Sequence, residues 1–220
     1  MHCSGTSAVI GALWESGVYL GQEEDVWPPD LMHEKGILEN RLITALNNQV
    51  LSDNGGKWDD PPTRVSWSQE RKQDRDQLIQ TFSDRGIWGF KDPRNLLTLS
   101  GWQEALPSMQ LVGVFRDPLR VISSLAKKEN FSAEQSSRLW IRYNVSLIAL
   151  YAEKAFPILS FDKEEDLVKK DLRLLALKLG LQPPEDMRFF ESQLRKSDPA
   201  EVKIPTMAKE IYEVLQKISI

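Results

Sequence analysis

Two short, almost entirely apolar runs, each stopped by a cation, an aspartate and a proline, restrict the fold of this chain most strongly. The run at 86–90 ends at Lys91, and the run at 111–115 ends at Arg116. A third run, at 158–161, has the same apolar character. Continuous apolar strands are typical of a parallel sheet that is covered on both faces, because neither face of such a strand meets water. The sequence therefore predicts a parallel sheet inside an α/β protein.

Segments with helical periodicity separate these runs. Helices are expected at about 8–15, 36–51, 68–82, 96–105, 118–128, 132–156, 163–179 and 205–218, with an extended piece at 18–20. Trp140, Tyr143 and Leu147 are expected to face the core, whereas the charged helix at 68–82 is expected to be solvated. Alternating strands and helices predict a three-layer α/β/α sandwich around a parallel sheet.

The composition restricts the class of protein further. A length of 220 residues suits one domain, residues 1–220, and a net charge of −4 argues against bulk nucleic-acid binding. The single cysteine, Cys3, rules out an intrachain disulfide and fits a reducing compartment. We find no apolar run long enough to span a membrane, no signal-peptide pattern and no metal-binding cluster, so a cytoplasmic protein is expected.

Three polar clusters fall where a parallel sheet binds ligands, beyond the carboxyl ends of its strands. The first is Ser4-Gly5-Thr6-Ser7, at the start of a helix, where backbone N–H groups and the helix dipole favour phosphate or sulfate. The same residues also suit an ordinary helix cap. No Gly-Lys-Ser/Thr follows, so the loop is not that of an ordinary ATPase or kinase.

The second and third clusters supply cations. Lys91 could place a point charge on a leaving-group oxygen, or it could be a surface lysine beside a turn. Arg116 and Ser124 could both reach one phosphate if the helix at 118–128 folds back over the strand end. The alternative is a surface pair of Arg116 with Asp117 and a serine inside a helix.

These clusters belong to a wider resemblance to the sulfotransferase family. The chain resembles bacterial-type and Golgi-type members that carry a short hydroxyl-rich loop. The matching stretches, in the family's order, are 2–7 (HCSGTS), 35–40 (KGILEN), 58–61 (WDDP), 88–94 (WGFKDPR), 115–119 (FRDPL) with 123–125 (SSL), and 139–144 (LWIRYN). The most specific stretch is the one from Arg116 to Ser124.

The resemblance implies a fold, a donor and the residues that hold it. The fold would be that of P-loop nucleoside triphosphate hydrolases, and the donor would be 3′-phosphoadenosine 5′-phosphosulfate. Ser4, Gly5, Thr6 and Ser7 would bind the 5′-phosphosulfate, and Arg116 with Ser124 would bind the 3′-phosphate.

Two catalytic roles follow from the same resemblance. Lys91 is similar to a lysine of protein-tyrosine sulfotransferases that stabilises the leaving phosphate oxygen. Glu39 is similar to the general base of that branch. Other candidates for the base are Glu23, Glu24, Glu34 and His2.

The chain departs from the family in two places. Cys3 stands where the family has arginine or lysine, a cation that helps to neutralise the phosphosulfate. The family also has a strand before the loop, and here only Met1 and His2 precede Ser4. We expect either a truncated chain or a sheet that forms without that strand. A basic segment at 189–196, with Arg195 and Lys196, is either a lid over the 3′-phosphate or an exposed amphipathic piece.

Three functions are considered from the sequence. The first is transfer of a sulfuryl group to a hydroxyl of a carbohydrate or other small acceptor. The second is a non-catalytic nucleotide-binding protein of the same fold, and the third is a small-molecule kinase, which the missing Gly-Lys-Ser/Thr disfavours. The acceptor and the oligomeric state cannot be predicted from these motifs.

Overall fold

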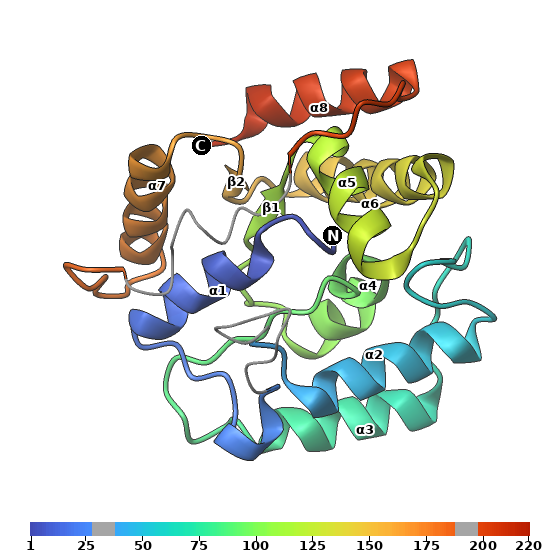
Figure 1. Ribbon diagram of the computed structural model, residues 1–220. Coiled ribbons are helices and arrows are strands. Elements are labelled where there is room, and N and C mark those ends of the chain that lie inside the picture. The colour runs from blue at the N-terminus through green and yellow to red at the C-terminus, as the bar shows by residue number, and fades with distance from the viewer. Residues whose placement is uncertain (28–37, 188–197) are drawn as a thin grey trace.

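The computed structural model describes residues 1–27, 38–187 and 198–220 (Figure 1). The elements are α1 (Thr6–Glu15), η1 (Glu23–Asp25), α2 (Arg41–Asp53), α3 (Gln69–Gln80), α4 (Asn95–Ala105), β1 (Gly113–Phe115), α5 (Pro118–Glu129), α6 (Ala133–Glu153), β2 (Ile158–Ser160), α7 (Glu165–Lys178) and α8 (Thr206–Ile218). Every helix that the sequence predicts is present, with ends that differ by a few residues. The largest difference is at the start of the helix predicted at 36–51, which begins only at Arg41.

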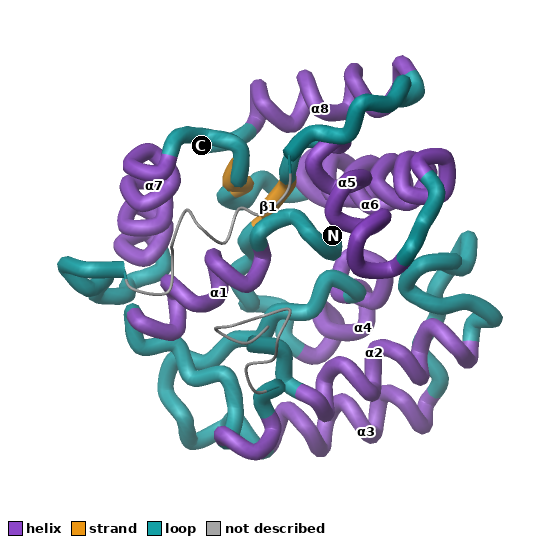
Figure 2. Tube along the Cα trace, in the orientation of Figure 1, coloured by secondary structure: helices purple, strands orange, loops and turns teal. Residues whose placement is uncertain are grey.

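The two strands form a small parallel sheet with helices on both faces (Figures 1 and 2). Val114 and Leu159 are paired in the register and pack into the cluster that contains α1 and α7. Phe115 and Ile158 lie on the opposite face, in the cluster that contains α5, α6 and α8. The predicted α/β class is therefore confirmed at the level of a parallel sheet covered on both faces.

The predicted strand at 86–90 is largely wrong. Within the described residues, this segment forms one isolated parallel bridge, between Trp88 and Tyr19, and no continuous ladder. The Tyr19 N–H donates to the Ile87 carbonyl, and the Gly89 N–H donates to the Tyr19 carbonyl, both at 3.0 Å. The predicted extended piece at 18–20 thus supplies the partner of this one bridge.

The helix boundaries have local causes. Asn40 caps α2, because its side chain accepts hydrogen bonds from the N–H groups of Leu42 and Ile43, which fixes the start of the helix. Asp117 caps α5 in the same way, and Pro118 occupies the first turn, where its missing N–H costs nothing. The chain therefore passes directly from β1 into α5, and Arg116 lies at the junction between them.

Burial agrees with most of the predicted pattern. Trp140, Tyr143 and Leu147 of α6 are buried, as predicted, whereas α3 buries only Arg75 among its residues. Leu42, in the first turn of α2, is 48% exposed.

A buried polar network sets the position of the turn that follows Lys91. The Asn47 amide on α2 donates to the Asp92 carboxylate at 2.8 Å and to the Asn95 side chain at 2.9 Å. Its oxygen accepts from the Thr98 hydroxyl and the Trp102 indole. All four bonds join α2 to the segment around α4, so this network holds the end of the 88–91 segment in place.

Among the helices in the described ranges, none has the length and apolar character needed to cross a membrane.

Candidate anion-binding and catalytic site

The loop at 2–7 turns sharply before α1. Cys3 and Gly5 have φ angles of 61° and 86°, and Gly5 is the cap residue of the helix. A Cβ at Gly5 would lie 2.3 Å from a ring carbon of Phe161, so only glycine fits there. The helix has no side-chain cap and no acidic residue in its first turn. The first turn of α1 therefore contributes no negative charge of its own to the positive end of the helix dipole.

Lys91 joins this loop to the predicted base. Its Nζ lies 2.7 Å from Glu39 Oε1 and 3.3 Å from Ser7 Oγ. The Lys91 and Glu39 side chains are only 11% and 9% exposed. Three of the predicted site residues, Ser7, Glu39 and Lys91, thus meet at one point although the first and the last are 84 residues apart. Glu39 reaches it because the cap at Asn40 fixes the backbone immediately after it.

Arg94 extends the charge cluster. Its Nη1 lies 2.8 Å from Asp92 Oδ1 and 3.7 Å from Glu39 Oε2. Sequence reasoning gave Arg94 no role, although it stands three residues after Lys91 in the same motif. The network of Asn47 was also missed, because nothing in the local pattern marks a helix asparagine as the partner of a distant turn.

Arg116 lies against the same loop. Its side chain is buried, its Nη1 donates to the Cys3 carbonyl at 3.4 Å, and its guanidinium lies 5.7 Å from the centre of the Phe161 ring. The Arg116 carbonyl accepts a 3.0 Å bond from the Trp140 indole, which fixes the backbone. Ser124 lies on α5 and is partly buried. The described part of the chain contains no direct hydrogen bond between Ser124 and Arg116.

Asp162 follows β2 and supports the segment after β1. Its Oδ2 accepts from the Asp117 N–H at 2.6 Å and from the Tyr212 hydroxyl at 3.1 Å. Burial raises the pKa of this carboxyl. Asp162 was not predicted as part of the site, although it follows the third apolar run just as Lys91 and Arg116 follow the first two.

The alternative candidates for the base lie elsewhere. Glu23 and Glu24 are exposed on η1, and Glu34 lies outside the described residues. His2 packs on Trp58, with ring centres 4.1 Å apart. Burial, with the nearby cations, lowers the pKa of His2 well below its ordinary value. Arg195 and Lys196, the cations of the predicted lid, also fall outside the described ranges.

Comparison of the chain with protein families, with curated proteins and with solved structures finds no match.

Proposed function

We propose that this protein is a sulfotransferase that moves a sulfuryl group from 3′-phosphoadenosine 5′-phosphosulfate to a hydroxyl of a carbohydrate or other small acceptor. The observation that carries the proposal is the position of Lys91. Its Nζ lies within 3.3 Å of both Glu39 and Ser7, at the uncapped start of α1. The start of α1 would hold the anion. Lys91 would supply a positive charge for the leaving group, and Glu39 would supply the base.

The cradle suits an oxyanion. Backbone N–H groups at a helix start bind phosphate or sulfate, and Gly5 adopts the positive φ angle that the turn before α1 requires. Cys3 brings no charge where the resembled family has a cation. Two cations nevertheless lie against the loop, because Lys91 contacts Ser7 and Arg116 contacts the Cys3 carbonyl. The charge that the loop lacks thus comes from the two segments beside it.

The proposed chemistry transfers one group and one proton. The acceptor oxygen forms a bond to sulfur while the bond from sulfur to the bridging phosphate oxygen breaks, and its electron pair stays on the phosphate. Lys91 stabilises that phosphate oxygen as its charge grows. Glu39, whose Oε1 lies 2.7 Å from Lys91 Nζ, takes the proton of the acceptor hydroxyl.

Arg116 gives the proposed donor specificity. A guanidinium binds a phosphate through two parallel hydrogen bonds, and Ser124 on α5 supplies a hydroxyl from the helix that follows. The 3′-phosphate is the group that separates this donor from ADP and ATP. Arg116 is held by Trp140 and Phe161, so it is positioned before any ligand binds.

Cys3 favours a second candidate, a nucleotide-binding protein that does not catalyse transfer. Cysteine cannot replace the cation of the resembled loop, which leaves Lys91 and Arg116, from neighbouring segments, to supply positive charge there. The two candidates agree on binding of the nucleotide and differ on turnover.

Transfer of sulfur-35 from labelled donor to a panel of saccharides and phenols tests the proposal. The unmodified protein should label an acceptor, and Lys91→Ala or Glu39→Ala should lower turnover while donor binding persists. Lys72→Ala, which removes a lysine of α3 that is paired with Glu104 of α4, is the matched control and should retain activity. Donor binding without transfer would support the second candidate. Loss of binding in Glu39→Ala would refute its role as base.

A further inference from the structure

The peptide group that joins Arg116 to Asp117 is held at both of its polar atoms. The Arg116 carbonyl accepts a hydrogen bond from the Trp140 indole of α6 at 3.0 Å. The Asp117 N–H donates to Asp162 Oδ2 at 2.6 Å. The carbonyl and the N–H of one trans peptide lie in one plane and point in opposite directions. The two hydrogen bonds therefore fix this plane, and with it the backbone from which the Arg116 side chain extends.

The side chain of Asp162 takes the place of a main-chain partner at this point. The last rung between β1 and the segment that ends β2 is the 3.0 Å bond from the Phe161 N–H to the Phe115 carbonyl. In a continued parallel ladder, the Asp117 N–H would donate to a carbonyl of the neighbouring strand. It donates to a carboxylate instead, so that the sheet ends and the chain turns into α5. This support consequently depends on one side chain, which a substitution can remove.

The same peptide group stands between the two residues that are proposed to bind the 3′-phosphate. Arg116 lies on its amino side. On its carboxyl side, the Asp117 carboxylate caps α5 by accepting from the N–H groups of Leu119 and Arg120, and α5 carries Ser124. A shift of this peptide would therefore displace the guanidinium and the start of the helix together.

Tyr212 extends the support to α8. Its hydroxyl donates to the same Asp162 oxygen at 3.1 Å, and its ring packs edge-on against Phe115, with ring centres 5.8 Å apart. Burial, together with the Asp162 carboxyl, raises the pKa of Tyr212, so the hydroxyl keeps the proton that it donates. Two donors from different elements thus hold one carboxylate oxygen in place.

We propose that Asp162 is a positioning residue, which orients Arg116 and the start of α5 for the phosphate that they bind, and that Tyr212 makes α8 part of this support. The role rests on the proposed function only in naming the 3′-phosphate as the bound group. A site loses affinity and selectivity when the residues behind its binding groups no longer hold them. Removing the Asp162 carboxylate should therefore weaken the contact with the 3′-phosphate more than the contact with the rest of the nucleotide.

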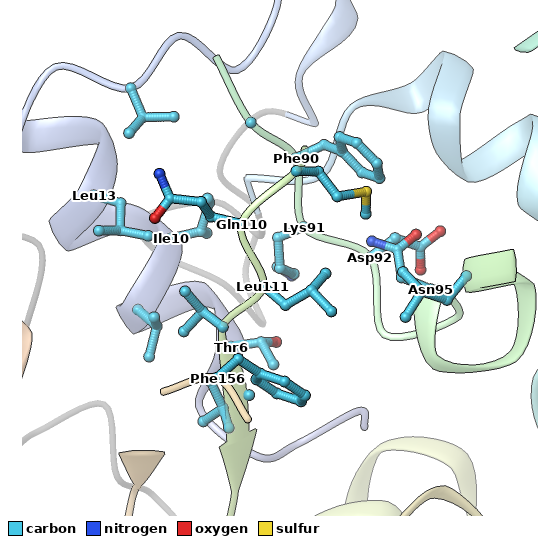
Figure 3. A pocket seen from close by; sticks show the side chains of 18 of the residues that line it. Thr6, Ile10, Leu13, Phe90, Lys91, Asp92, Asn95, Gln110, Leu111 and Phe156 are labelled. Atoms are coloured by element: carbon cyan, nitrogen blue, oxygen red, sulfur yellow. The ribbon is translucent and has the colours of Figure 1, made fainter. Parts of the chain in front are cut away.

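The half of the proposed site that binds the 5′-phosphosulfate has its own supports. Thr6 and Lys91 line a cavity of about 450 Å³ (Figure 3), and neither Arg116 nor Asp162 is among the described residues around it. Lys91 is held by Glu39 at 2.7 Å. ADP has no 3′-phosphate, so its affinity should change little when Asp162 is replaced.

The first measurement follows Arg116 itself, without a nucleotide. Asp162→Ala should speed hydrogen exchange of the Asp117 amide at least about tenfold, and nitrogen-15 relaxation should show a more mobile Arg116 Nε. The Phe161 amide, which donates to Phe115, is the internal reference and should change little. Asp162→Asn keeps an oxygen that can accept both hydrogen bonds, so it should restore slow exchange and the rigid Arg116 signal.

The second measurement is the ratio of the affinities for adenosine 3′,5′-bisphosphate and ADP, by calorimetry. Asp162→Ala should reduce the preference for the bisphosphate at least about tenfold, Tyr212→Phe should reduce it less, and Asp162→Asn should retain it. Asp171→Ala, which removes a partly buried carboxylate paired with Lys163, is the matched control. It should lower the free energy of unfolding but leave the preference unchanged.

Two results would overturn the positioning role. One is a rigid Arg116 in Asp162→Ala, and the other is an unchanged preference in that variant when the unmodified protein prefers the bisphosphate. If Asp162→Ala does not fold, Tyr212→Phe decides by the same two measurements. If Arg116 becomes mobile in the variant but the unmodified protein binds both nucleotides equally, the positioning role stands and the proposed 3′-phosphate site is wrong.

Discussion

Replacing Gly5 by alanine should destabilise the protein by roughly 2–5 kcal/mol. The φ angle of Gly5 is 86°, and holding a residue with a side chain there costs about 1–2 kcal/mol. The new methyl group would also lie 2.3–2.5 Å from three ring carbons of Phe161, and relieving such a clash in a packed core costs about 1–3 kcal/mol. Movement of that ring would disturb Arg116, whose guanidinium lies over it.

The free energy of unfolding in urea measures this cost, and the chain contains a matched control. Gly17 has a φ angle of 100° and nothing within 4 Å of its built Cβ, so Gly17→Ala should show the backbone cost alone, about 1–2 kcal/mol. The extra cost of Gly5→Ala should largely disappear when Phe161 is alanine in both members of the comparison. If Gly5→Ala and Gly17→Ala cost the same, the proposed contact between the loop and Phe161 is wrong.

Three further predictions concern the same site. Lys91→Met should lower the free energy of unfolding by about 3 kcal/mol, because it leaves the Glu39 carboxylate buried without its closest partner. Adding Glu39→Gln to this variant should recover most of that loss. If nothing is recovered, the two side chains are not coupled. Asn47→Ala should cost roughly 3 kcal/mol by urea unfolding, because buried partners lose their bonds, whereas Asn48→Ala, at an exposed neighbour, should cost under about 1 kcal/mol. The free energy of unfolding should fall as the pH is lowered from 8 to 6, because His2 takes up a proton in the unfolded chain but, with its lowered pKa, not in the folded chain. The urea midpoint of His2→Asn should therefore depend less steeply on pH than that of the unmodified protein. An equal slope for the two proteins would contradict the burial of His2.

The parts of the fold that were predictable are those encoded within a few residues. Continuous apolar runs identified β1 and β2, and the aspartate and proline after the first of them marked the start of α5. The late start of α2 was not anticipated, although Asn40 is a good cap, because a glycine at 36 offered an earlier beginning. The residues that resemble a known family also marked Lys91 and Glu39, which the structure brings together.

The rest depended on pairing between distant segments. The run at 86–90 is as apolar as the run that forms β1, yet it makes only one bridge, because a strand requires a partner and the sequence cannot show which edges remain open. The network of Asn47 spans 45 to 55 residues and is carried by side chains that look like ordinary helix positions. Asp162 was missed for the same reason, since its partners come from the N-cap of α5 and from α8.

The proposed donor site recognises a 3′-phosphate through Arg116. Calorimetric titration with adenosine 3′,5′-bisphosphate and with ADP, on the unmodified protein and on Arg116→Ala, measures it most directly. We expect the unmodified protein to bind adenosine 3′,5′-bisphosphate more tightly than ADP, and Arg116→Ala to lose that preference. Equal affinity of the unmodified protein for the two nucleotides would contradict the assignment.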